Sequence, residues 1–244
     1  MSTGASSTDS EEKVSKKEVW IELSLLWLGT LLLMRFVIFL HDSLSLPEIV
    51  LGIPPLLFVY APVWLCSYRK VDSWSYQLSI PAFRDYQQWW QALRLCIIMN
   101  LLLWPWYVVL YHNWVWFFAG KTFAWNLPQN LLLTSAFHFF YVAIPEEFFY
   151  RGYMQGRFSE IYEKKWTIFG TPIGWASVIT SVFFAFGHSL IVLQWWHFAI
   201  FFPSLLFAWM RERSGGVVAG AMFHASCNIG VVILDTLYGI RSPL

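Results

Sequence analysis

The chain alternates between apolar runs of about twenty residues and short polar or aromatic connections. A run of that length is long enough to cross the hydrocarbon core of a bilayer as a helix. The pattern therefore predicts an all-α fold, a polytopic membrane helical bundle with about seven transmembrane helices, give or take one. We expect these spans at residues 19–40, 47–68, 91–111, 130–150, 171–193, 194–210 and 215–237.

The connections are rich in aromatic residues in two places, residues 73–90 and 112–127. Trp and Tyr gather where a membrane meets water, so we expect both segments to be interfacial. Pro54 and Pro55 fall inside the second span and predict a kink or a broken helix there. The first apolar run is too long for a signal-peptide core and is interpreted as a retained membrane helix.

The chain divides into three regions. Residues 1–18 are Ser/Thr-rich and charged, and predict a disordered cytoplasmic tail. Residues 19–128 should hold the N-terminal membrane helices with their interfacial loops. Residues 129–240 should form the membrane core that holds the unusual polar residues described below.

Charge supports one orientation in the membrane. Lys and Arg accumulate on alternate connections, as the positive-inside rule requires of the cytoplasmic side. This places the N-terminus in the cytoplasm, and we expect an integral protein of a bacterial or archaeal cell membrane. The basic residues on the inner side are Lys13, Lys16, Lys17, Arg69, Lys70, Arg84, Arg94, Arg157, Lys164, Lys165, Arg211 and Arg213, with Lys121 and Arg241 opposite.

Composition excludes a soluble domain. Hydrophobic residues make up 57% of the chain and charged residues only 13%, against about a quarter in soluble proteins. The net charge of +1 gives no reason to expect nucleic acid as a partner, and membrane lipid is the expected surrounding. Cys66, Cys96 and Cys227 form no CxxC pair, so neither a disulfide framework nor a thiolate metal site is indicated. The oligomeric state has no signature in the sequence.

Two adjacent carboxylates and an arginine lie inside one of the expected spans. An ionisable side chain near the bilayer centre costs at least about 2.5 to 3.5 kcal/mol, so Glu146, Glu147 and Arg151 need partners or a function. On a helix Glu147 and Arg151 stand at i,i+4 and can pair, whereas Glu146 points about 100° away. We therefore expect Arg151 to neutralise the charge of Glu147, while the Glu146 carboxylate faces a different group.

Three further polar residues lie in later spans. Phe184 and His188 form a Phe-x-x-x-His motif, and His224 with Asn228 forms His-x-x-x-Asn. The second pair lies on one helical face, one turn apart. The alternative for His188 is a satisfied packing residue. For His224 with Asn228 it is a hydrogen bond between helices, worth about 0.6 kcal/mol on average in membranes.

Together these residues match the needs of peptide-bond hydrolysis, which are an activated water, a proton carrier and donors for the oxyanion. Our hypothesis is that Glu146 deprotonates water and His188 shuttles its proton. His224 and Asn228 would donate to the oxyanion. Glu147 and Arg151 would fix the geometry around Glu146.

The three motifs, Glu-Glu-x-x-x-Arg, Phe-x-x-x-His and His-x-x-x-Asn, resemble those of the CAAX prenyl protease and bacteriocin-processing family, also called the Abi family. The Phe-Tyr-Arg-Gly sequence of residues 149–152 fits as well. The resemblance covers about residues 130–235, while the first three spans match only as generic membrane helices.

The resemblance implies a glutamate-type intramembrane endopeptidase that needs no metal and no cofactor. Glu146 and His188 would activate water, and His224 with Asn228 would bind the oxyanion. The implied partner is a protein or peptide with a C-terminal lipidated or hydrophobic segment. Family members that mature prenylated proteins cleave after a lipidated cysteine, whereas many bacterial relatives process peptides or cleave C-terminal sorting anchors.

Other interpretations of the same residues stay open. Glu146, His188 and His224 could hold zinc, although no His-Glu-x-x-His is present. A carrier could use the buried carboxylate and histidines as a proton relay, but the chain has no convincing internal repeat. A catalytically silent scaffold is the third alternative. Of the remaining histidines, His41, His112, His138 and His197, we expect His138 to lie nearest the cavity.

Overall fold

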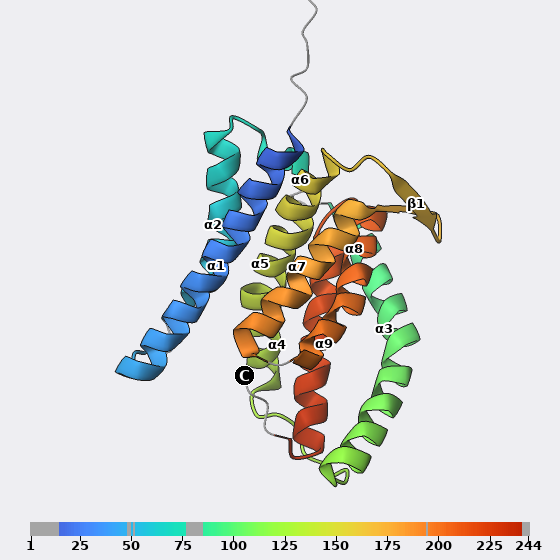
Figure 1. Ribbon diagram of the computed structural model, residues 1–244. Helices are drawn as coiled ribbons and strands as arrows, with labels where there is room; N and C mark the ends of the chain where they lie inside the picture. The colour runs from blue at the N-terminus through green and yellow to red at the C-terminus, as the bar shows by residue number, and fades with distance from the viewer. Residues whose placement is uncertain (1–14, 48–49, 51, 77–84, 194, 241–244) are drawn as a thin grey trace, which may run out of the picture.

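The computed structural model describes residues 15–47, 50, 52–76, 85–193 and 195–240. Its long helices lie side by side in one bundle, which confirms the predicted all-α helical class (Figure 1). On one side α1 (Lys16–Leu44) pairs with α2 (Ile53–Tyr68), and on the other side lies α3 (Tyr86–Trp114) with its π-helical extension η3 (Val115–Ala119). The remaining helices stand between these two flanks.

A single helical line crosses the centre of the bundle. It consists of α4 (Leu131–Phe137), α5 (Ile144–Glu147) and α6 (Gln155–Ser159), joined by the π-helical segments η4 (His138–Ala143) and η5 (Phe148–Met154). The predicted fourth span is part of this line. Bulges of π type occur frequently at functional sites. Here one lies on each side of Glu146 and Glu147.

Three helices surround that line. They are α7 (Trp175–Val192), α8 (Phe201–Ser214) and α9 (Val218–Leu237). The predicted fifth and seventh spans correspond to α7 and α9. The predicted sixth span is replaced by the 3-10 helix η6 (Trp195–Ile200) followed by α8, and its first residue, 194, lies outside the described residues.

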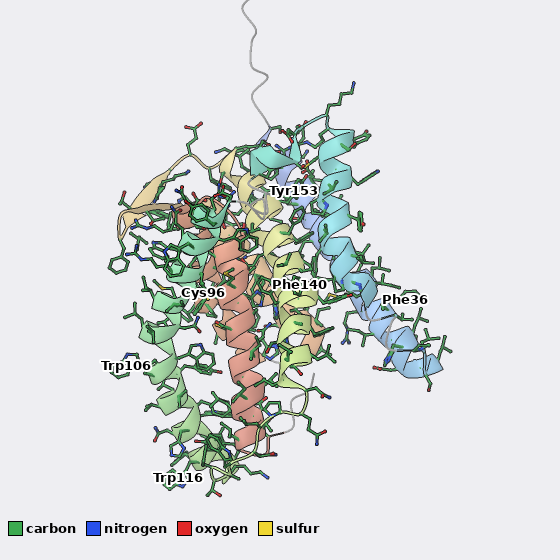
Figure 2. The ribbon with its side chains drawn as sticks, turned by 180° about the vertical axis from the view of Figure 1, so that it is seen from behind. Phe36, Cys96, Trp106, Trp116, Phe140 and Tyr153 are labelled. Carbon is green, nitrogen blue, oxygen red and sulfur yellow. The ribbon has the colours of Figure 1, made fainter. Side chains whose placement is uncertain are left out.

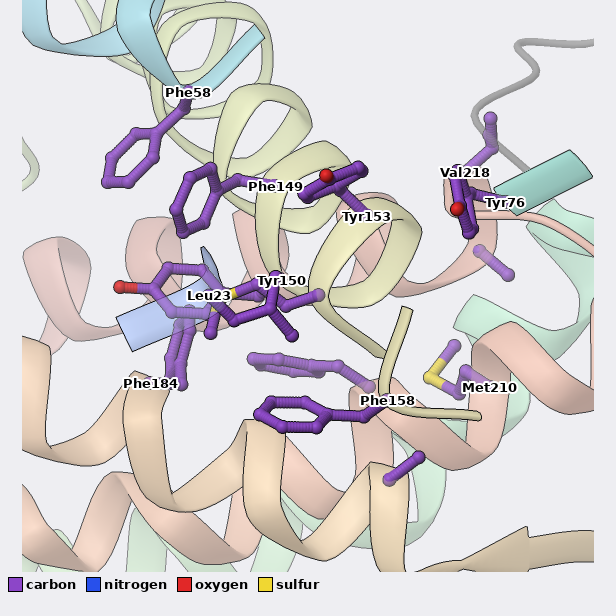
Figure 3. Close-up of a cluster of buried hydrophobic side chains, with 14 of the residues drawn as sticks. Leu23, Phe58, Tyr76, Phe149, Tyr150, Tyr153, Phe158, Phe184, Met210 and Val218 are labelled. Carbon is purple, nitrogen blue, oxygen red and sulfur yellow. The ribbon is translucent and has the colours of Figure 1, made fainter. Parts of the chain in front are cut away.

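Aromatic side chains hold the central line in place. Phe149 packs edge to face on Phe58 of α2, with ring centroids 4.9 Å apart, and Tyr150 packs in the same way on Phe184 of α7, also at 4.9 Å. Figure 3 shows these rings converging on η5 from several helices. The line is therefore anchored by neighbours on opposite sides.

A polar network closes the end of the bundle at which α1 begins. Glu22 of α1 accepts hydrogen bonds from the Tyr153 hydroxyl at 2.5 Å and from Arg157 Nη2 at 3.2 Å. Tyr76 of the short 3-10 helix η2 (Ser73–Tyr76) donates to Glu160 at 2.6 Å and accepts from Arg69 at 3.1 Å. The network ties the N-terminal helices to the central line.

Two strands were not predicted. β1 (Lys165–Ile168) and β2 (Thr171–Gly174) form an antiparallel hairpin, in which Lys165 pairs with Gly174 and Ile168 with Thr171. The prediction that residues 171–174 open the fifth span is therefore wrong. This stretch is rich in β-branched and aromatic residues, which favour strand over helix.

The proline prediction was also wrong. Helix α2 begins at Ile53, so Pro54 and Pro55 occupy its first turn, where a missing N–H costs no helical hydrogen bond. Of the interfacial segment predicted at residues 73–90, residues 77–84 lie outside the described chain, as do residues 1–14 of the predicted tail. Arg35 donates to the Ile191 carbonyl at 2.8 Å, a contact between helices.

The outer surface of the bundle is apolar. Phe36 of α1 and Trp106 of α3 point away from it (Figure 2). Three segments of the described chain are long and apolar enough to cross a membrane: Lys16–Leu44, Tyr86–Ala119 and Val218–Leu237. The protein is therefore an integral membrane protein, while the count of about seven spans stays a prediction for the other helices.

Helix α9 approaches α3 through Gly230. A methyl group added at Gly230 would lie 1.9 Å from a ring carbon of Trp104. We expect Gly230→Ala to displace that ring and to lower the free energy of unfolding by about 1 to 3 kcal/mol. The measurement is thermal unfolding in detergent.

Gly29 of α1 is the matched control, because a methyl group there would meet nothing within 4 Å. Gly29→Ala should leave stability unchanged or raise it by about 0.5 to 1 kcal/mol through helix propensity. Equal effects of the two substitutions would contradict the close packing of α3 on α9.

Candidate active site

The predicted pairing of Glu147 with Arg151 is present at the centre of the bundle. Arg151 Nε lies 3.4 Å from Glu147 Oε2, and both side chains are fully buried. Arg151 Nη2 also donates a hydrogen bond to Ser204 Oγ of α8 at 2.9 Å. The π-helical turn η5 thus holds an ion pair that a third helix stabilises.

Aromatic rings surround the guanidinium. Its central carbon lies 4.6 Å from the centre of the Phe184 ring and 5.7 Å from that of Phe207. Cations at such distances from a ring face are attracted by its quadrupole. Phe184, predicted as a supporting residue, therefore contacts Arg151 directly.

His224 stands between the two carboxylates. Its Nδ1 lies 3.1 Å from Glu147 Oε1, and its Nε2 lies 3.8 Å from Glu146 Oε2. Phe207 stacks on its ring at 4.9 Å with an interplanar angle of 14°. An ionised carboxylate only accepts, so Nδ1 carries the hydrogen and Nε2 faces Glu146. Glu147 thus orients His224, whereas the sequence had suggested that it supports Glu146.

His188 is oriented in the same way by its own helix. Its Nδ1 lies 2.9 Å from the carbonyl oxygen of Phe184, which can only accept, so Nδ1 carries the hydrogen here too. Its Nε2 is then directed at Glu146 Oε2, 3.7 Å away. The i,i+4 spacing of the Phe-x-x-x-His motif makes this bond possible.

Glu146 is the point at which these groups meet. Both imidazole Nε2 atoms face the same oxygen of its carboxylate, and that oxygen has no hydrogen-bond partner among the described residues. The lone pairs of the two Nε2 atoms and the carboxylate oxygen repel one another. A proton shared between them, or a hydrogen-bond donor that bridges them, is therefore needed. Separations of 3.7 and 3.8 Å suit a bridging water.

The site reaches the surface through His188. The His188 side chain is 28% exposed and that of Glu146 12%, whereas Glu147 and Arg151 have no exposed surface. A reacting group would therefore approach from the His188 side. The buried Glu147–Arg151 ion pair lies behind Glu146 and is not accessible to such a group.

Asn228 and His138 are the two remaining polar residues that the sequence analysis singled out. Asn228 lies one turn beyond His224 on α9, is half-buried and has no hydrogen-bond partner among the described residues. His138 is buried, its Nδ1 has no partner among those residues, and it interacts electrostatically with His224. The expectation that His138 lies near the site stays a prediction. If residues 138–146 formed a regular α-helix, the His138 side chain would point about 80° away from that of Glu146 around the helix axis. The wider π turns of η4 reduce this angle.

Three residues of the site carry no sequence signal. Ser204 and Phe207 lie in α8, which has no motif. Gly220 of α9 lets the backbone approach Glu147, since a methyl group there would lie 3.2 Å from Oε2. No grouping of three metal-binding side chains was found among the described residues.

Comparison with known proteins gives one match. Residues 128–230 match a family model described as Type II CAAX prenyl endopeptidase Rce1-like. This segment contains every residue of the site described above. No curated protein and no solved structure matches the chain.

The Ser204 hydroxyl is the hydrogen-bond partner of a buried cation. We expect Ser204→Ala to leave Arg151 Nη2 unpaired and to lower the free energy of unfolding by about 1 to 3 kcal/mol. Thermal unfolding in detergent measures the change.

Ser135→Ala is the matched control, because Ser135 Oγ bonds only the Leu131 carbonyl of its own helix, at 2.7 Å. Its effect should stay below about 0.5 kcal/mol. If the Ser204 variant were as stable as this control, the hydroxyl would have no part in holding Arg151.

Proposed function

We propose that the protein is an intramembrane endopeptidase, because residues 128–230 match the family model of Rce1-like type II CAAX prenyl endopeptidases. Its substrate is a protein or peptide with a lipidated or hydrophobic C-terminal segment. The observation that carries the proposal is the convergence of two oriented histidines, His188 and His224, on the Glu146 carboxylate. We further place it in a bacterial or archaeal cell membrane, with the N-terminus in the cytoplasm.

Glu146 and His188 activate the nucleophile in this proposal. A water molecule between them gives one proton to the pair, and its oxygen forms a bond to the scissile carbonyl carbon. Both groups lie within reach of one water, because their nearest polar atoms are 3.7 Å apart. The Phe184 carbonyl keeps His188 in the tautomer whose Nε2 can accept that proton.

His224 and Asn228 stabilise the oxyanion that the attack creates. A protonated Nε2 of His224 and the amide of Asn228 are the donors, one turn apart on α9. Glu147 accepts from Nδ1 of His224 and thereby holds the ring with Nε2 turned toward Glu146. Arg151 in turn balances the charge of Glu147.

Collapse of the tetrahedral intermediate breaks the carbon–nitrogen bond. The leaving nitrogen takes up the proton that Glu146 and His188 received from water, so the pair returns to its starting state. A single cluster of side chains thus provides base, acid and oxyanion donors. Carriage of protons across the membrane would instead require a chain of groups at different depths.

The first test replaces the proposed base. We expect Glu146→Gln, which keeps the side-chain shape and removes the carboxylate, to lower kcat by about 10² to 10⁴-fold. Cleavage would be followed in liposomes with a farnesylated CAAX peptide and with a bare C-terminal membrane-anchor peptide. The preferred peptide would identify the substrate class.

Glu163→Gln is the matched control, because Glu163 is exposed and lies outside the site. It should cleave at the wild-type rate. Full activity of a folded Glu146→Gln protein would overturn the proposal and favour a carrier or scaffold, which proton-flux measurements on the same preparation would separate.

The second test concerns metal. The proposed mechanism uses only side chains and water, so dialysis against a chelator should leave kcat and KM unchanged. A loss of cleavage that zinc restores would replace this mechanism with one in which Glu146, His188 and His224 are ligands.

A further inference from the structure

The hairpin between α6 and α7 has an unfavourable turn residue at its tip. Phe169 and Gly170 form a two-residue connection with φ of +49° and +74°. Positive φ at both positions defines the type I′ turn, in which Asn-Gly is strongly preferred. A bulky aromatic residue is rarely found in this left-handed conformation. The presence of Phe169 therefore calls for a contact that compensates the strain.

The ring of Phe169 has no such contact within the described chain. The Phe169 side chain is 88% exposed, the highest fraction among the large apolar side chains described, and its ring makes no aromatic contact with them. Trp166 and Ile168 of β1 are also exposed, at 36% and 45%. The hairpin thus presents an apolar tip to its surroundings.

The hairpin is basic as well as apolar. Lys164 and Lys165 are both exposed, and residues 164–175 contain no acidic residue. Arg213 Nη1 donates to the Phe169 carbonyl at 3.4 Å and adds a third cation at the tip. This combination of aromatic tip and lysines is complementary to a membrane surface that carries anionic headgroups.

The position of the hairpin is consistent with such a surface. Trp209 Nε1 donates to the Ile168 carbonyl at 3.0 Å, so the tip is fastened beside the last turns of α8. Figure 1 shows the hairpin projecting from the side of the bundle at the end where α6 and α8 finish. That is the depth at which charged residues replace the apolar surface of α8.

We propose that the 164–175 hairpin is a binding surface for anionic phospholipid. Phe169 lies at the boundary of headgroups and acyl chains, and Lys164 and Lys165 pair with lipid phosphates. The hairpin joins the helical line that carries Glu146 to α7, which carries His188. The bound lipid therefore fixes the depth in the membrane of the segment that connects these two elements.

The depth of Phe169 can be measured directly. The full-length protein, with 4-fluorophenylalanine at position 169, is placed in nanodiscs of phosphatidylcholine and phosphatidylglycerol. Fluorine line broadening is compared for a lipid spin-labelled near its headgroup and for an aqueous gadolinium chelate. We expect the lipid label to broaden the line several-fold more than the chelate. The reverse order, or no broadening by either agent, would overturn the proposal. A label at the fully buried Phe158 should respond to neither.

The lysines are tested by titrating phosphatidylglycerol into the detergent-solubilised protein and following the fluorine shift at position 169. Each lysine beside an anionic surface contributes about a fivefold preference. Lys164→Gln and Lys165→Gln should each raise the midpoint by about that factor. Lys121→Gln, at the end of the bundle where α3 finishes, should not. Equal midpoints for all three variants would show that the hairpin does not select anionic lipid.

Phe169→Asn separates lipid contact from internal packing. Asn is favoured in this turn, so the variant should unfold in lipid-free detergent at the wild-type temperature or above it. Its stabilisation by added phosphatidylglycerol should be lost. A lower unfolding temperature in lipid-free detergent would show that the ring packs within the protein, and would overturn the proposal. None of these measurements uses peptide cleavage, so they stand whether or not the protease proposal holds.

Discussion

The buried ion pair of Glu147 and Arg151 lies at the centre of the bundle and constrains the helices around it. Neither side chain has exposed surface, and removal of one partner from a buried pair costs about 3 to 5 kcal/mol. Three neighbouring helices contact it. Ser204 of α8 accepts from the guanidinium, Gly220 of α9 leaves room for the carboxylate, and Phe184 of α7 packs on the cation. The ion pair therefore fixes how close these three helices can stand to η5.

The same pair assigns different environments to two neighbouring carboxylates. Consecutive residues on a helix point about 100° apart, so Glu147 faces Arg151 while Glu146 faces the two histidines. Glu147 has its charge balanced and uses its second oxygen to orient His224. Glu146 keeps an oxygen without a protein partner among the described residues. Division of two adjacent acids into one positioning and one reacting group is a recurrent way of separating roles in active sites.

Helical periodicity was enough to predict the pairing of Glu147 with Arg151, while a joint role of His224 and Asn228 stays a prediction. The spacing of Glu147 with Arg151 and of His224 with Asn228 depends only on the turn of one helix, and the structure shows both on α-helical or π-helical backbone. Contacts between helices could not be read in this way, because Ser204 and Phe207 are ordinary residues of an apolar helix until packing brings them to Arg151 and His224. The hairpin was missed for another reason. Residues 171–174 carry no charge and run directly into the apolar span that follows, and hydrophobicity alone does not distinguish the end of a strand from the start of a membrane helix.

The compactness of the Glu146 cluster has an electrical consequence. The two histidine Nε2 atoms lie 3.7 and 3.8 Å from Glu146 Oε2, so a proton that passes between a histidine and this carboxylate travels only a short distance along the membrane normal. Movement of one charge across the whole membrane changes its energy by about 2.3 kcal/mol per 100 mV, but movement within the cluster spans only a small part of that field. In the proposed mechanism, proton exchange within this cluster is therefore nearly independent of the transmembrane voltage.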